Sequence, residues 1–135
     1  MSRPYERGGD EVYAMYYNRL TGWLWFALGA LGLTRAPTGD YIHLTTPETG
    51  IALAAGCLGM LGARVTRRNQ VVVCGILLLV YVAWLWLGAS PRFNRWMSTT
   101  PLESVLRLLE ALWALYCLAA ELWGWRTRRL SVAEP

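Results

Sequence analysis

The amino-acid sequence predicts an all-α, polytopic membrane protein with four transmembrane helices that form two hairpins. The main observation is the stretch Val71–Ala89, which carries no charge over about 19 residues, long enough to cross about 30 Å of hydrocarbon as a helix. The chain is 55% hydrophobic and 16% charged, against roughly 25% charged in soluble domains. Its eight tryptophans and seven tyrosines are typical of membrane proteins, because amphipathic rings settle at the level of the lipid headgroups.

The length of 135 residues leaves room for one domain, so we expect a single integral membrane domain over 1–135. We place its spans at approximately 12–34, 47–64, 71–89 and 101–124. The first span opens with tyrosines at helical spacing and contains glycines that allow another helix to approach closely. It ends before Pro37–Asp40, whose residues favour a turn.

The second span begins with helix-start chemistry and has a face of small residues. Thr45 suits the cap and Pro47 the first turn, while Glu48 stands three residues after Thr45, as a capping box requires. Small side chains cover about one third of the helix surface: Ala52, Ala55, Gly56, Gly59, Gly62 and Ala63. We expect this face to pack against other helices, because close backbone contact favours helix association in lipid. A tight turn is expected at Arg64, Arg67, Arg68, Asn69 and Gln70.

The third and fourth spans are bounded by aromatic and cap signals. Trp84 and Trp86, near the end of the third span, suit a belt of aromatic side chains at the membrane interface. The fourth span opens with Thr100 as the cap, Pro101 at the first helical position and Glu103 completing a capping box.

The arginines predict the orientation, because cytoplasmic loops carry an excess of basic residues. Nine arginines fall on one side: Arg3, Arg7, Arg19, Arg64, Arg67, Arg68, Arg126, Arg128 and Arg129. Four fall on the other: Arg35, Arg92, Arg95 and Arg107. We therefore expect both termini in the cytoplasm, with the protein in the inner membrane of a bacterium. This placement also accounts for the net charge of +4 without a nucleic-acid partner.

The fourth span carries the one constellation that invites a functional hypothesis. Four charged side chains point within about 60° of one another on a helix: Glu103, Arg107, Glu110 and Glu121. Glu110 lies about 14 Å beyond Pro101 at about 1.5 Å per residue, close to the middle of the membrane. A charge at that depth costs roughly 2.5–3.5 kcal/mol, and pairing with Arg107 or protonation lowers this cost.

This charged stripe has three interpretations. We expect Arg107 to pair with Glu103 and Glu110, and Glu121 to lie close to the arginines that follow the helix. The interpretation we favour is a structural ion pair that fixes how the helix packs. The alternatives are a polar pathway or binding site built on Glu110 and Arg107, and a helix that lies along the interface instead of spanning.

The remaining reactive residue types predict neither a metal, nor a cofactor, nor an enzyme. Cys57, Cys74 and Cys117 each fall in a different apolar segment, and we interpret them as packing residues. The single histidine, His43, shares an external loop with Asp40, and we expect this loop to be solvated rather than to form a pocket. No nucleophile–base pair or nucleotide motif accompanies them.

Two segments of the chain resemble a known family. Thr49–Gly56 reads TGIALAAG, and Ser104–Ala111 reads SVLRLLEA. They are similar to the starts of the second and fourth helices in a family of small four-helix bacterial membrane proteins known only as a domain of unknown function. Ala52 and Arg107 stand where that family has histidines, whereas Gly56 is kept. The resemblance implies a four-helix membrane fold and no particular activity.

Together these observations favour a small non-enzymatic membrane protein that acts as an accessory or structural subunit. We expect it to pack with itself or with a larger membrane complex through the small-residue face of the second span. The alternative is an oligomeric transporter or channel for ions or small molecules, with Glu110 and Arg107 as its intramembrane site. Four short spans are few for a transport path, so this alternative requires several copies.

Overall fold

The computed structural model of the chain describes residues 13–34, 44–93, 96 and 100–132. These residues form four α-helices and no strand, so the predicted all-α class with four helices is confirmed. The helices are α1 (Tyr13–Thr34), α2 (Thr46–Gly62), α3 (Arg67–Ala89) and α4 (Pro101–Val132).

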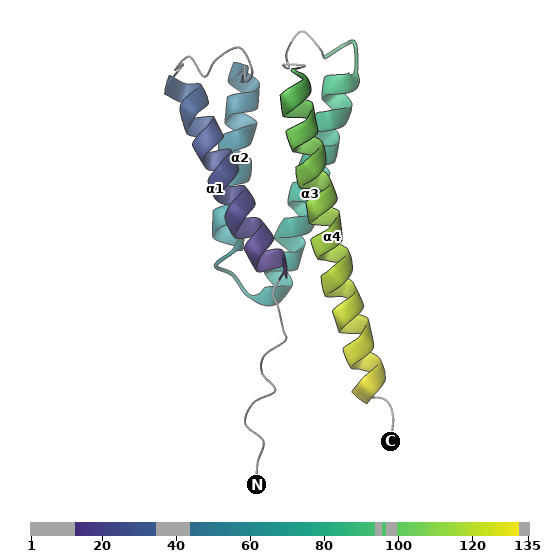
Figure 1. The fold of residues 1–135 in the computed structure, drawn as a ribbon. Coiled ribbons are helices and arrows are strands. Elements are labelled where there is room, and N and C mark those ends of the chain that lie inside the picture. Colours follow the sequence, from purple (N-terminus) through teal and green to yellow (C-terminus); the bar gives the residue numbers. More distant parts are fainter. Residues whose placement is uncertain (1–12, 35–43, 94–95, 97–99, 133–135) are drawn as a thin grey trace.

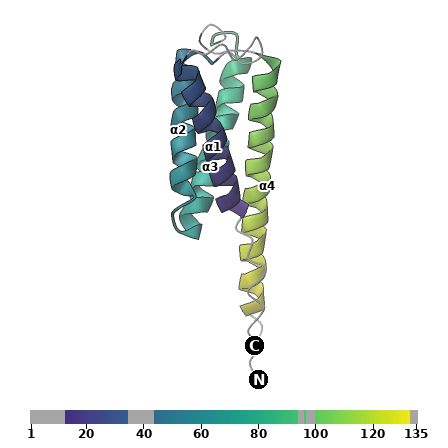
Figure 2. The ribbon, with the colours of Figure 1, turned by 60° about the vertical axis from the view of Figure 1, so that its left-hand side comes forward.

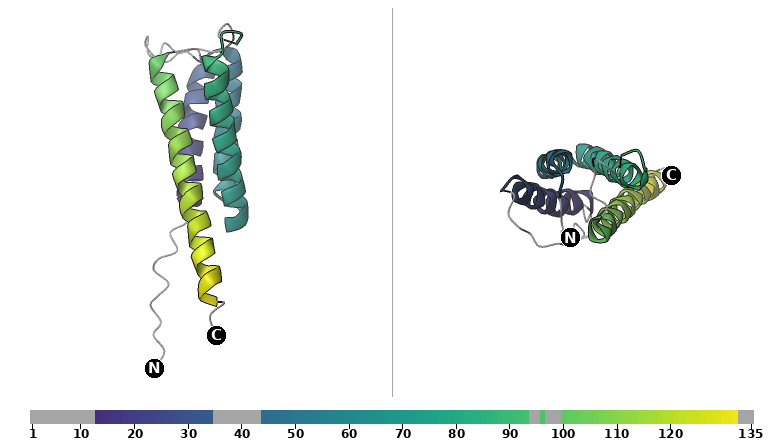
Figure 3. Two further views of the ribbon diagram at one scale, coloured as in Figure 1. Left: turned by 90° about the vertical axis from the view of Figure 1, so that its right-hand side faces the viewer. Right: turned by 90° about the horizontal axis from the view of Figure 1, so that it is seen from above.

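The helices run up and down as two hairpins, α1 with α2 and α3 with α4 (Figure 1). We refer to the end at which α2 and α4 begin as the upper end, and to the end at which α1 and α3 begin as the lower end. Seen from above, the hairpins lie side by side, with α2 next to α3 and α1 next to α4 (Figure 3). α4 extends beyond the other three helices at the lower end (Figure 2).

Two helix boundaries differ from the predicted ones by more than two residues. Residues 67–70 were expected in a turn but form the start of α3, so the connection from α2 is confined to residues 63–66. The side-chain amide of Gln70 closes this connection by donating to the carbonyl oxygens of Ala63 (3.3 Å) and Val65 (3.0 Å). At the other end of the second hairpin, α4 runs to Val132, about 12 Å further than position 124 at about 1.5 Å per residue.

Glycines let α1 and α2 pack with their backbones in contact. A Cβ atom on Gly56 would lie 2.5 Å from the backbone nitrogen of Phe26, far inside contact distance. A Cβ atom on Gly59 would lie 2.8 Å from the Cα atom of Gly22. One on Gly22 would lie 2.6 Å from the backbone nitrogen of Met60. No side chain fits at these three positions, so they fix the distance between the helices.

The small-residue face of α2 is covered within the chain. Five of its six predicted small residues are buried, namely Ala52, Ala55, Gly56, Gly59 and Gly62, while Ala63, the C-cap, is half-buried. Gly56 and Gly59 lie against α1, and Gly62 lies against Val73 of α3. The surface that we expected to meet another subunit is therefore occupied by the chain's own helices, because α1 already fills the space that these small side chains leave.

Aromatic side chains fill the space between the two hairpins. The ring of Trp25 in α1 stacks on that of Tyr81 in α3, with centroids 5.5 Å apart, and lies 5.2 Å from that of Trp84. The predicted interfacial position of Trp84 is wrong, because only 1% of this residue is exposed. Trp86, two residues later, points outward and is 73% exposed.

The outer surface of the bundle is apolar, and several of the chain's charges lie inside. Large exposed apolar residues include Leu20, Trp23, Leu33, Leu61, Leu79, Leu109, Leu115 and Trp123. The described helices include one, α3, that is long and apolar enough by length and composition to cross a membrane. In α4, the charged residues of the predicted stripe lower the apolar character of the helix as a whole.

Candidate functional site

The structure places the four charged residues of the predicted stripe on α4 in the interior of the bundle. Their exposed fractions are 4% for Glu103, 1% for Arg107, 5% for Glu110 and 2% for Glu121. Arg107, Glu110 and Glu121 contact polar side chains of other helices, and Glu103 forms an ion pair with Arg107 of the same helix. We refer to these four residues and their partners, which follow one side of α4 from the upper end to the lower end, as the polar column.

The upper part of the polar column centres on Arg107. Its Nη2 atom donates to Glu48 Oε1 at 2.8 Å and to Glu103 Oε2 at 3.2 Å. Its guanidinium carbon lies 4.3 Å from the centroid of the Trp84 ring, which is a cation–π contact. The Trp84 Nε1 atom in turn donates to Glu48 Oε1 at 3.4 Å. One buried cation thus holds α2, α3 and α4 together.

Glu48 has two structural roles, of which the sequence predicts one. Its Oε2 atom accepts from the backbone nitrogen of Thr45 at 3.0 Å, which is the expected half of a capping box. The Thr45 hydroxyl lies 3.0 Å from the same oxygen. The other carboxylate oxygen faces Arg107 and Trp84, and the residue is fully buried. The start of α2 and the charge of α4 are therefore stabilised by one carboxylate.

The middle of the polar column is Glu110. The hydroxyl of Thr21 in α1 donates to Glu110 Oε2 at 2.6 Å, and the Tyr17 hydroxyl lies 3.4 Å from the Glu110 backbone oxygen. The predicted ion pair between Arg107 and Glu110 is absent from the described residues, which give Glu110 no cationic partner. The reason is competition, because Arg107 is engaged by two other carboxylates.

The lower part of the polar column is an ion pair between α3 and α4. The Nε and Nη2 atoms of Arg67 donate to Glu121 Oε2 at 3.3 Å and 3.1 Å. The partner of Glu121 among the described side chains is therefore a residue that we expected in a turn. The side chains of Arg128 and Arg129, two of the arginines expected near Glu121, lie outside the described part of the chain. Nearby, the Asn18 side-chain amide donates to the Gln70 backbone oxygen at 2.9 Å, which links α1 to the start of α3.

A double-mutant cycle checks the lower ion pair. We expect Arg67→Gln and Glu121→Gln to show a coupling of about 1 kcal/mol in the free energy of unfolding, because the arginine side chain is 31% exposed and partly screened. The matched cycle of Arg126→Gln with Glu121→Gln should show no coupling. Coupling in the second cycle and none in the first would restore the pairing predicted from the sequence.

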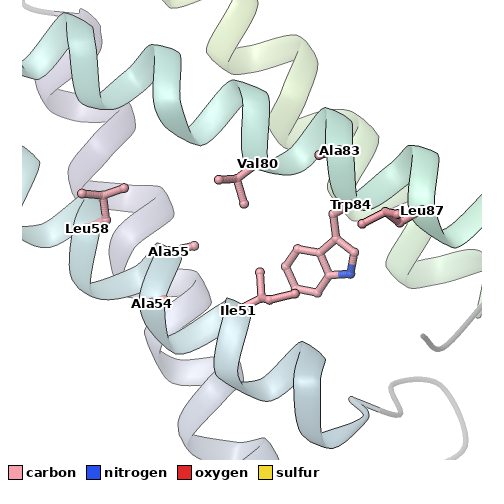
Figure 4. A pocket seen from close by; sticks show the side chains of 8 residues that line it. All are labelled: Ile51, Ala54, Ala55, Leu58, Val80, Ala83, Trp84 and Leu87. Atoms are coloured by element: carbon pink, nitrogen blue, oxygen red, sulfur yellow. The ribbon is translucent and has the colours of Figure 1, made fainter. Parts of the chain in front are cut away.

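Most charges of the polar column pair with one another and are therefore not available to a ligand. Two guanidinium groups, those of Arg67 and Arg107, meet three of the four buried carboxylates. A groove beside the upper part of the polar column lies between α2 and α3 and has a volume of about 350 Å³. It is lined by apolar side chains, including Trp84 (Figure 4). It therefore offers an apolar surface rather than a polar binding site.

No other cluster of reactive groups appears in the described part of the chain. There, no three histidine, cysteine, aspartate or glutamate side chains gather to hold a metal ion. Cys57 is exposed, whereas Cys74 and Cys117 are buried, and the Cys74 sulfur lies 3.7 Å from the Ala114 carbonyl oxygen. Asp40 and His43 lie outside the described residues.

Comparison with known proteins adds no relative. No family model matches the chain, and neither a curated protein nor a solved structure is significantly similar to it. The family resemblance of the second and fourth helices therefore stays a prediction.

Sequence reasoning missed three of the residues that complete the polar column: Thr21, Arg67 and Trp84. No local pattern marks them, since each contacts a residue far away in the chain. Glu48 was noticed for its capping signal alone. A clue to Arg67 and Thr21 was available, since an excess of inward-facing carboxylates on one helix calls for cations and hydrogen-bond donors on the others.

Proposed function

We propose that the chain is an integral membrane protein whose four helices all cross the bilayer, with both termini on the cytoplasmic side of a bacterial inner membrane. The observation that carries this proposal is the distribution of polarity. Arg107 and four glutamates are buried, and three of these glutamates form ion pairs, while leucine and tryptophan side chains cover much of the outside. Large exposed apolar surfaces are uncommon in soluble monomers, whereas lipid favours them.

The dimensions of the helices agree with this proposal. α1 with 22 residues and α3 with 23 are about 33 to 35 Å long, which matches the hydrocarbon thickness. α2 has 17 residues and is shorter than the hydrocarbon thickness. To cross the bilayer, it needs either a locally thinner bilayer or a contribution from the residues that flank it. α4 presents leucines outward along its length: Leu102, Leu108, Leu109, Leu112, Leu115 and Leu122. Its charges therefore need not face lipid.

A cysteine-accessibility experiment tests the topology. In a variant without the three native cysteines, we expect single cysteines at Arg64 and Arg68 to react with a membrane-impermeant maleimide only after the cells are opened. A cysteine at Arg92, at the upper end, should react in intact cells. The reverse pattern would overturn the orientation, and labelling of all three positions in intact cells would overturn the four crossings.

We further propose that the protein is a non-catalytic accessory or structural subunit. The polar column supports this proposal, because its charges are satisfied by residues of the same chain and so stabilise one arrangement of the helices. The exposed apolar faces and the groove between α2 and α3 offer contact area to other membrane helices. Since α1 covers the small-residue face, the groove replaces it as the proposed contact surface.

Purification in mild detergent with mass spectrometry of the associated chains tests this role. We expect the wild type to appear as a homo-oligomer or with a defined set of partners. Filling the groove by Ala54→Trp or Ala83→Trp should remove this association, whereas Val82→Trp, which lies outside the groove, should leave it intact. A wild-type monomer without any partner would contradict the proposal.

The second candidate function is transport by an oligomer, and one observation favours it. Glu110 is buried near the middle of the bundle, and its carboxylate accepts from the Thr21 hydroxyl while no described cation pairs with it. It is thus the carboxyl group of the polar column best placed to take up and release a proton. Proteoliposomes in which Glu110→Gln leaves the ion flux unchanged would exclude this function.

A further inference from the structure

We propose that a pocket at the lower end, between α1 and α2, binds the phosphate group of an anionic phospholipid. The pocket has a volume of about 350 Å³ and lies on the hairpin α1–α2. It is lined by Met15, Arg19, Trp23, Met60, Ala63 and Arg64. This inference rests on the proposed membrane location, because it needs the lower end to lie at the level of the headgroups.

The two arginines of the pocket are the first argument for an anionic ligand. Arg107 and Arg67 both form ion pairs with glutamates, but in the described residues no acidic side chain pairs with Arg19 or Arg64. Both side chains are exposed. A guanidinium group binds phosphate oxygens through two parallel N–H donors, so two unpaired guanidinium groups beside one pocket fit a phosphodiester.

The packing of the hairpin is the second argument, because it holds the two arginines near each other. Gly59 contacts both Gly22 and the backbone oxygen of Asn18, which places the residue after Asn18 beside the end of α2. Arg19 therefore lies at the level of the connection between α2 and α3, where Arg64 stands. The pocket thus lies beside the close backbone contact of α1 and α2, with Ala63 and Arg64 contributed by the connection to α3.

The remaining lining residues fit the apolar part of a lipid. Trp23 follows Arg19 by one helical turn and is 60% exposed, which suits a ring that lies just below the headgroups. Met15 and Met60 offer flexible thioether side chains to the glycerol and the first methylene groups. Basic pockets between helices on the cytoplasmic side are known to suit anionic headgroups.

Lipid retention by the full-length protein tests the site. The purified protein in mild detergent is mixed with phosphatidylglycerol or with phosphatidylcholine of the same acyl chains, and bound lipid is counted by native mass spectrometry. We expect phosphatidylglycerol to be retained preferentially. Arg19→Gln and Arg64→Gln should each lower its retention roughly fivefold, the effect of one basic residue near a membrane surface.

Two matched controls separate this site from general basic charge. Arg68→Gln removes the same charge at the same end but outside the pocket lining, and Arg92→Gln removes it at the upper end. Both variants should retain the lipid like the wild type. Equal loss in Arg68→Gln, or equal retention of the two lipids by the wild type, would overturn the site.

Two further measurements complete the test. One identifies the source of the phosphate, and the other distinguishes a failure of the lipid site from a failure of the proposed membrane location. Glycerol 3-phosphate at millimolar concentration should not displace the lipid, and displacement would show a site for a soluble phosphate instead. Extraction of cell membranes with alkaline carbonate reports the membrane location independently. A protein that stays in the membrane but shows no lipid preference would overturn the lipid site alone, whereas a protein that is extracted would overturn the membrane location.

Discussion

Replacing Arg107 by glutamine is expected to lower the free energy of unfolding by about 3–5 kcal/mol, because it leaves buried carboxylates without their cation. Arg107 holds both Glu48 and Glu103, and it also contacts Trp84. Unfolding in mild detergent, followed by tryptophan fluorescence, measures this loss. Arg92→Gln, at an exposed position, serves as the control and should change the stability by less than about 0.5 kcal/mol.

A charge-free version of the same cluster shows whether the loss comes from the unpaired acids. In the triple variant Glu48→Gln, Glu103→Gln and Arg107→Met, no charge remains to be buried alone. We expect this variant to be more stable than Arg107→Gln by at least about 2 kcal/mol, since apolar or neutral replacements of buried ion pairs are often tolerated. A triple variant that is as unstable as the single one would indicate that the packing of the arginine side chain matters more than its charge.

Introducing a side chain at Gly56 is the second change with a large expected effect. In Gly56→Leu, the Cβ atom would lie 2.5 Å from the backbone nitrogen and 2.7 Å from the Cα atom of Phe26, so α1 and α2 must separate. Overpacking costs about 1–3 kcal/mol where neighbouring side chains can move aside. The atoms that the new Cβ atom would meet here belong to the backbone, which cannot move aside in this way. We therefore expect a loss of at least about 3 kcal/mol, measured by the same unfolding experiment.

The matched control for this change is Gly75→Leu in α3. Apart from its chain neighbours and the nearby backbone of its own helix, no atom lies within 4 Å of a Cβ atom at Gly75, so the new side chain projects into open space. We expect a change of less than about 1 kcal/mol, with helix propensity favouring leucine. If Gly56→Leu and Gly75→Leu behave alike, the close approach of α1 and α2 is not what stabilises the hairpin.

The helices could be predicted from the sequence because their signals are local. Pro101 at the start of α4 and Thr45 at the start of α2 are cap signals that act within a single turn. The common face of the four charges in the α4 stripe could also be predicted, since it follows from helical spacing alone. The start of α3 could not, because arginines close to a predicted span read equally well as a turn or as the first turn of a helix.

The partners of the charged residues could not be predicted from the sequence. Arg107 has two acids at helical spacing, and local reasoning pairs it with both. In the structure Glu48 takes the place of Glu110, because the packing of the two hairpins brings the start of α2 beside α4. Glu110 is left to Thr21 in α1. Such choices depend on how helices distant in sequence are arranged, and no single segment encodes that arrangement.

The ion pair between Glu48 and Arg107 has a consequence for biosynthesis, because it joins the first hairpin to the second. The ribosome releases α1 and α2 before α4 exists, so Glu48 has no countercharge while the first hairpin is made. Arg107 can likewise pair with Glu48 only after both hairpins have met. Each half of the chain therefore supplies charges that the other half needs. Residues 1–66 and 67–135 expressed as separate polypeptides are expected to assemble with one another and to protect one another from degradation.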